Sequence, residues 1–243
     1  MRESEEFFVG YLPIPPKLRR SLWLTIALIP AALLAVGATA ATFREAPAAS
    51  MLAEVTLIGR LEARGYGVLW TASSDGKQSA VLLARGGKFG AADLASKHDG
   101  KVVSLRGLLL EREGTRMLEI QELDDHPSGG EGAREALRTI DLDKRGARTL
   151  RGEIVDIKCW LGRMKPGDGR THRACAQFCI AGGMPPVLAA TDGQRYVLTD
   201  LAGRPINEAV LPFVAEAVEL RGDLEVGGGL NFLRVDPRLI HRL

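Results

Sequence analysis

Residues 103–109 read VSLRGLL, and residues 218–224 read VELRGDL. A second pair of phrases lies upstream: TLIGRL at residues 56–61 and TLRGEI at residues 149–154. The phrases occur in the same order in both halves, and each closing phrase is followed by a short turn and a further strand-like stretch. Ordered recurrence indicates a repeated structural unit. The sequence therefore predicts two copies of one fold.

The first copy has the alternation of apolar residues that indicates half-buried β-strands. The alternation is clear along residues 103–110, with Gly107 in the middle. Gly107 and its counterpart Gly222 are expected at a bend or bulge, and residues 113–114, Glu-Gly, at a hairpin turn. The expected strands of this copy are residues 53–63, 67–72, 79–84, 101–111 and 116–122.

Five short strands with an insertion before the fourth resemble the OB fold, a small closed barrel. Residues 91–97 would form this insertion in the first copy and residues 207–216 in the second. We therefore expect a mainly β protein with two tandem OB-like barrels; one β-sandwich built from the same strands is the alternative. The expected domains are residues 50–125 and 148–243, joined by a linker at residues 126–147 that contains PSGGEG.

Residues 21–43, SLWLTIALIPAALLAVGATAATF, contain no charged side chain. As a helix they would span about 34 Å, enough to cross a hydrocarbon core of about 30 Å. Lys17, Arg19 and Arg20 precede the segment, whereas only Arg44 lies directly beyond it. Because positive charge stays on the cytoplasmic side, we expect a single-pass protein of the bacterial inner membrane.

In this topology residues 1–20 are a cytoplasmic tail and everything after the helix is periplasmic. A cleaved signal peptide is the alternative, since residues 38–40, Ala-Thr-Ala, resemble a cleavage site. The remainder of the chain is exported in both cases.

The charge pattern argues against a nucleic-acid partner. The formal net charge of the 243 residues is +2, and basic and acidic side chains are interspersed. The sequence has no basic stripe with interleaved aromatic residues, which is the pattern typical of nucleic-acid binding.

All three cysteines fall in one stretch that the first copy lacks, residues 159–186, CWLGRMKPGDGRTHRACAQFCIAGGMPP. Residues 174–180 are expected to form a short helix that stops at the following glycines and prolines. On a helical path that starts slightly earlier, His172, Cys175 and Cys179 follow at steps of three and four and share one face. Cys159 would approach that face from the end of the preceding strand.

Three thiolates and an imidazole form a familiar tetrahedral set for zinc. Met164 and Met184 lie nearby in the sequence, which makes the softer ion Cu(I) chemically sensible as well. An iron–sulfur centre fits less well, since its usual cysteine spacings are absent. The candidate metal ligands are therefore Cys159, His172, Cys175 and Cys179.

Two other interpretations of the cysteines stay open. Exported cysteines are usually paired, so one disulfide, from Cys159 to Cys175 or Cys179, could staple the insertion and leave one free thiol. Thiol chemistry would instead require an activated cysteine beside His172 or Arg173. The sequence contains no GxSxG or HExxH motif and no other complete catalytic motif, so it favours a protein that is not an enzyme.

The motif GEIVDIKC…MKPG…HRACAQFC…GGMPP resembles one found in a group of bacterial membrane-anchored proteins, which implies kinship but no activity. A tethered, exported OB barrel also resembles the haem chaperone of cytochrome c maturation. That family attaches haem through a histidine near the end of its single barrel. His172 lies in an early loop, so no haem-binding residue is carried over.

Together these features predict a periplasmic metal-binding or redox accessory subunit, held at the membrane beside an oxidoreductase. The alternative is a structural or assembly subunit, in which the cysteines form a disulfide staple and the barrels bind protein. Residues 7–16, FFVGYLPIPP, favour this alternative, because an apolar, proline-rich tail suits docking to a partner in a membrane complex.

Overall fold

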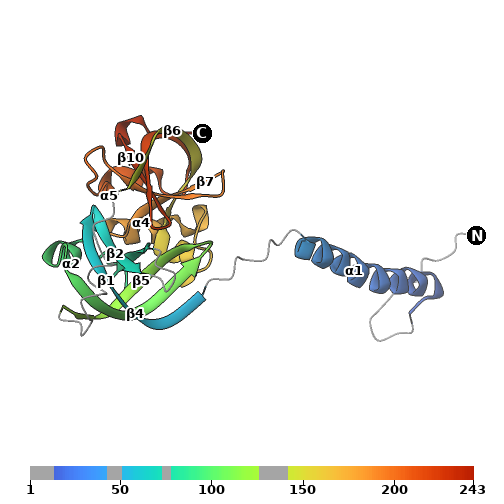
Figure 1. The fold of residues 1–243 in the computed structure, drawn as a ribbon. Helices are drawn as coiled ribbons and strands as arrows, with labels where there is room; N and C mark the ends of the chain where they lie inside the picture. The colour runs from blue at the N-terminus through green and yellow to red at the C-terminus, as the bar shows by residue number, and fades with distance from the viewer. Residues whose placement is uncertain (1–13, 43–50, 73–77, 126–141) are drawn as a thin grey trace, which may run out of the picture. The chain divides into compact units, whose positions relative to one another are not determined.

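The computed structural model describes residues 14–42, 51–72, 78–125 and 142–243 (Figure 1). The chain forms two compact units, an N-terminal helix and a β-rich unit. The predicted linker, residues 126–147, falls mostly outside the described residues, and a strand already begins at Asp143.

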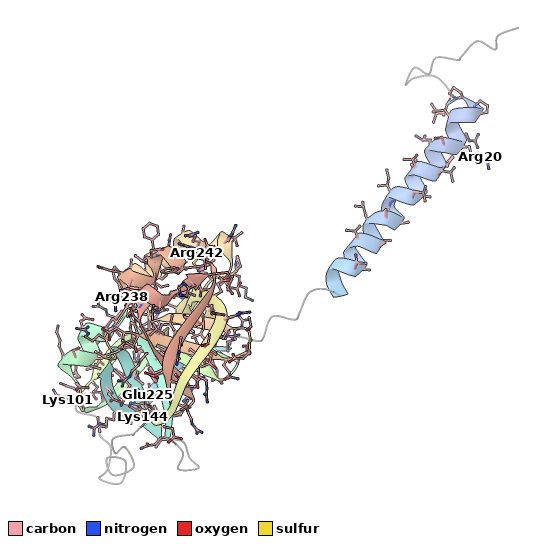
Figure 2. The ribbon with its side chains drawn as sticks, turned by 90° about the horizontal axis from the view of Figure 1, so that it is seen from above. Arg20, Lys101, Lys144, Glu225, Arg238 and Arg242 are labelled. Carbon is pink, nitrogen blue, oxygen red and sulfur yellow. The ribbon has the colours of Figure 1, made fainter. Side chains whose placement is uncertain are left out.

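Helix α1, Pro16–Thr42, covers residues 21–42 of the predicted membrane segment and begins five residues before it; residue 43 lies outside the described residues. Proline suits the first position of a helix because its missing N–H would have no partner there. Residues Leu18–Thr39 are long and apolar enough to cross a membrane, and the described side chains of this span are exposed. Figure 2 shows Arg20 near the N-terminal end of α1.

The first barrel is closed in the strand order β1-β2-β3-β5-β4. The strands β3 and β5 pair in parallel, and the other neighbours pair antiparallel. The predicted insertion before the fourth strand is the helix α2, Ala92–Lys97. The strands are β1 (Met51–Arg64), β2 (Tyr66–Ala72), β3 (Gln78–Ala84), β4 (Val102–Arg112) and β5 (Thr115–Asp124).

The second barrel repeats this topology in the order β10-β8-β7-β6-β9, closed by pairing of β9 with β10. The parallel pair is now β8 with β10, and the helix α5, Asn207–Val210, and the 3-10 turn η3, Leu211–Phe213, precede the fourth strand. The strands are β6 (Asp143–Asp156), β7 (Pro186–Ala190), β8 (Arg195–Thr199), β9 (Ala217–Gly227) and β10 (Leu230–Val235). The short strand β11, His241–Arg242, follows the 3-10 turn η4, Pro237–Leu239, and extends the sheet beside β9.

The echoed phrases occupy equivalent places in the two barrels. Gly59 on β1 lies opposite Val103 on β4, and Gly152 on β6 lies opposite Val218 on β9, so the register is the same. A Cβ atom on Gly59 or Gly152 would collide with the backbone of the neighbouring strand. The close contact between neighbouring strands therefore requires glycine at these two positions of the repeat. The alternative prediction of one β-sandwich is wrong, because the strands close into two barrels.

The barrels pack against each other through a shared apolar core. Each barrel also has a core of its own. Charged residues such as Lys101, Lys144 and Arg242 lie on the outside of this double barrel (Figure 2). The shared core includes Tyr66, Trp70, Leu82 and Met117 from the first barrel and Val155, Trp160, Val187 and Phe232 from the second.

Candidate metal centre

The cysteine-bearing insertion leaves the second barrel after β6 and returns at β7. It starts with a π-type turn, η1, at Cys159–Arg163, in which Gly162 has a φ of 109° that only glycine adopts readily. A 3-10 turn, η2, at Arg170–His172 leads into the helix α4, Arg173–Ala181. Cys159 therefore begins the insertion, and the other three candidate ligands lie in η2 and α4, in its C-terminal part.

Helix α4 agrees with the helix predicted for residues 174–180 within one residue at each end. Cys175 and Cys179 are one turn apart and share a face. Ala176 and Ile180 anchor the helix in the core of the second barrel. The helix ends at Gly182, and Gly183 follows with a φ of 94°.

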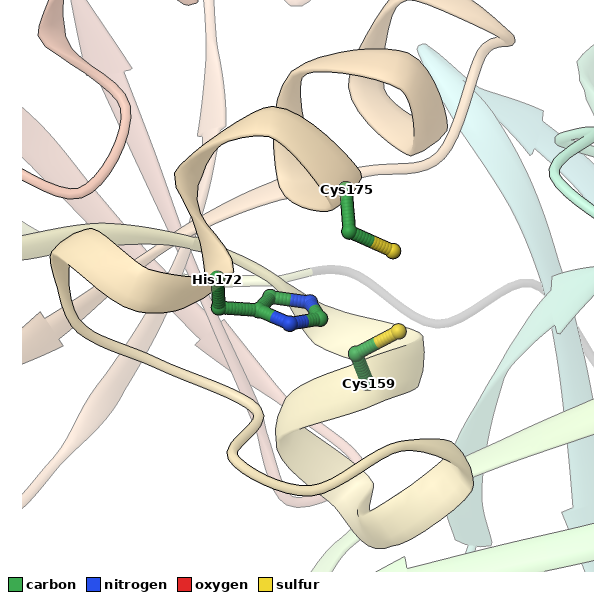
Figure 3. Close-up of side chains that lie close together, drawn as sticks. All are labelled: Cys159, His172 and Cys175. Atoms are coloured by element: carbon green, nitrogen blue, oxygen red, sulfur yellow. The ribbon is translucent and has the colours of Figure 1, made fainter.

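An outer group is formed by Cys159, His172 and Cys175, whose ligand atoms lie within 4.8 Å of one another. Figure 3 shows the three side chains pointing toward a common centre from η1, η2 and α4. His172 is only 5 % exposed, and its Nε2 atom has no hydrogen-bond partner among the described residues. A buried imidazole nitrogen without a partner is costly, and a metal ion at this centre would satisfy it.

An inner group is formed by Asp156, Cys159 and Cys179, also within 4.8 Å of one another. Asp156 is fully buried at the end of β6. Its Oδ1 atom accepts a hydrogen bond from the backbone N–H of Lys158 at 3.0 Å, while Oδ2 has no partner among the described residues. The four predicted ligands thus converge, but as two groups joined by Cys159.

Asp156 is a ligand candidate that the sequence analysis missed. The available signal was its spacing, three residues before Cys159 at the predicted end of a strand. A strand turns its successive side chains to opposite faces, so the strand pattern alone did not reveal that Asp156 points toward the cysteines.

All three cysteines are free thiols. The hydrogen bond between the side chains of Cys159 and Cys179 raises the pKa of Cys159 and lowers the pKa of Cys179. Burial adds to the rise at Cys159, and the nearby Lys88 ammonium adds to the fall at Cys179. Cys179 is therefore the more acidic thiol of the pair.

Lys88 brings a positive charge to the cluster from the first barrel. Its Nζ atom donates to the Cys175 sulfur at 3.0 Å and lies 3.9 Å from the Cys179 sulfur. The hydrogen bond to Cys175 raises the pKa of Lys88, so the ammonium form is held there. An ammonium beside thiolates favours their charged, metal-binding form.

Glycine contacts fix the loop that carries Lys88. The backbone N–H of Gly90 donates to the carbonyl oxygen of Gly182 at 2.9 Å. A Cβ on Gly90 would collide with the carbonyl of Gly183, and a Cβ on Gly182 would collide with the carbonyl of Lys88. The loop at residues 84–90, ARGGKFG, therefore contacts the end of α4 directly.

The two methionines of the insertion have different surroundings. The sulfur of Met164 lies 3.7 Å from the sulfur of Cys175, and the side chain is 50 % exposed. Met184 is fully buried in the core that the barrels share. Only Met164 is therefore placed as a soft donor beside the outer group.

The donor set suits a transition metal better than a hard cation. It offers three sulfur atoms, an imidazole and one carboxylate, and thiolate and imidazole ligands favour zinc and copper over magnesium or calcium.

The comparisons of this chain with known protein families, with curated proteins and with solved structures each give no significant match.

Proposed function

We propose that this protein is a membrane-anchored accessory protein that binds a transition metal on the periplasmic side, beside a membrane oxidoreductase. The observation that carries the proposal is that His172 and Asp156 each lie in a group with the Cys159 sulfur whose ligand atoms are within 4.8 Å of one another, while His172 Nε2 and Asp156 Oδ2 are buried without a hydrogen-bond partner among the described residues. An unsatisfied buried polar group costs about 1–3 kcal/mol. A bound ion would remove that cost at the residue that it contacts.

The membrane anchor supports an accessory role. Arg19 and Arg20 lie at the start of α1, and the positive-inside rule then assigns this end to the cytoplasm and the barrels to the opposite side. A tether confines the metal site near the membrane surface and raises its effective concentration toward a membrane partner. Such confinement favours delivery of a metal or an electron to a neighbouring complex over action in solution.

Elemental analysis with thiol counting tests the proposal on the full chain, purified in detergent without added reductant. We expect about one equivalent of zinc or copper per chain, with thiols that react only after the ion is chelated. Cys175→Ser should lose the ion and keep the fold, because Cys175 is only partly buried. Phe178→Ser, an exposed position on the same helix, is the matched control and should keep the ion.

The alternative function has a different outcome in the same experiment. If no ion is found and a single thiol reacts after denaturation, the cysteines form a disulfide staple. The metal proposal then fails, and the chain is a structural or assembly subunit.

A further inference from the structure

The side chain of Met164 is unusual among the methionines of this protein. Met117 and Met184, whose side chains the structure also describes, are fully buried. Met164 is half exposed, and its sulfur faces Cys175 at 3.7 Å on the solvent side of the cluster. An exposed apolar side chain contributes little hydrophobic stabilisation to the fold. The feature that distinguishes Met164 is therefore its contact with the sulfur of Cys175.

A thioether discriminates between the two ions that suit the cysteines. Zinc in proteins is bound by thiolate, imidazole and carboxylate groups. Cysteine together with methionine instead selects soft Cu(I). Met164 therefore adds to the outer group a donor that is useful to copper and not to zinc.

On the basis of the proposed function, we infer that the outer group binds Cu(I), with Met164 as the ligand on the solvent side. Met164 and the partly buried Cys175 then form the accessible edge of the site, and Cys159 and His172 its buried wall. A copper ion held this way is open to exchange with another soft donor that approaches from solvent. The site is therefore suited to copper transfer.

Competition titrations of the reduced, full-length protein in detergent test this inference, using bathocuproine disulfonate for Cu(I) and a chromophoric chelator for Zn(II). Met164→Leu should weaken Cu(I) binding about tenfold, in line with the usual effect of groups around a metal, and leave Zn(II) binding unchanged. Met184→Leu is the matched control and should change neither affinity. X-ray absorption should show one more sulfur neighbour around copper in the unmodified protein than in Met164→Leu.

Each outcome is decisive. If Cu(I) binds equally well to Met164→Leu, or if Zn(II) outcompetes Cu(I) in the unmodified protein, the copper inference is overturned while the metal-binding function stands. If the unmodified protein binds neither ion, the proposed function itself fails.

Discussion

The ammonium nitrogen of Lys88 lies 3.0 Å from the sulfur of Cys175, although Lys88 follows β3 of the first barrel and Cys175 belongs to the insertion of the second. The candidate metal centre therefore receives groups from both barrels. A change in their packing would separate the Lys88 ammonium from the sulfur atoms that it faces.

Amine labelling should report this contact. Because the hydrogen bond to Cys175 raises the pKa of Lys88, less of the reactive neutral amine is present at a given alkaline pH. We expect Cys175→Ser to make acetylation of Lys88 several-fold faster in the metal-free protein, as measured by peptide mass spectrometry. The exposed Lys97 serves as an internal control whose rate should not change. Equal Lys88 rates in both proteins would show that the contact is not formed in solution.

In the loop that carries Lys88, we expect alanine to be tolerated in place of Gly86 but not in place of Gly90. Gly90→Ala forces a Cβ into the carbonyl of Gly183, whereas a Cβ on Gly86 meets its nearest neighbour only at 3.9 Å. Overpacking of this kind typically costs about 1–3 kcal/mol. Gly90→Ala should therefore lower the urea midpoint and weaken metal binding, and Gly86→Ala should do neither. Equal behaviour of the two variants would contradict the docking of this loop on α4.

The fold was predictable from the sequence because its signals are local. Strand alternation, the glycine of each repeated phrase and the hairpin at Glu113 are properties of neighbouring residues, and the structure places Glu113 and Gly114 at positive φ between β4 and β5. The packing of one barrel on the other was not predictable. It depends on surfaces formed by residues far apart in the chain, such as Trp70 and Phe232 in the shared core.

The candidate metal centre was likewise predictable from local sequence patterns but not from contacts between residues far apart in the chain. Cys159, His172, Cys175 and Cys179 could be predicted to lie together because one insertion contains them all. Lys88 is 87 residues from Cys175, and no local pattern connects them. The tetrahedral set predicted from spacing also became two groups around Cys159, since side-chain direction depends on the turn at η1.

Trp160 should contribute strongly to the cohesion of the barrels. Trp160 is buried, and the guanidinium groups of Arg112 on β4 and Arg195 on β8 lie 4.4 and 4.2 Å from the centroid of its ring. Trp160→Ala should lower the free energy of unfolding by about 3–5 kcal/mol, as measured by urea denaturation. Phe178→Ala, at a 69 % exposed position, should change it by less than about 0.5 kcal/mol. A small effect at Trp160 would mean that the barrels are held together elsewhere.

The orientation in the membrane can be tested with a C-terminal epitope. We expect proteinase K to remove the epitope from spheroplasts, because the positive charges at the N-terminal end of α1 keep that end in the cytoplasm. Replacement of Lys17, Arg19 and Arg20 by glutamine, with arginines added beyond residue 43, should reverse the result. An epitope protected in spheroplasts of the unmodified protein would place the barrels in the cytoplasm and exclude a periplasmic role.

Because two candidate ligand groups share Cys159, we expect substitution of Cys159 to lower the metal affinity more than substitution of Cys179. Cys159 belongs to both groups, whereas Cys179 belongs only to the inner one. Cys159→Ser should therefore abolish metal binding, because each group loses its shared sulfur. Cys179→Ser leaves the outer group complete and should weaken the affinity by about 10- to 100-fold without abolishing it, as expected for a neighbour of the ligands. Both affinities can be measured by chelator competition on the reduced protein. If Cys179→Ser loses the ion as completely as Cys159→Ser, then Cys179 is a direct ligand, and the ion draws the two groups into the single tetrahedral site that the spacing of the sequence predicts.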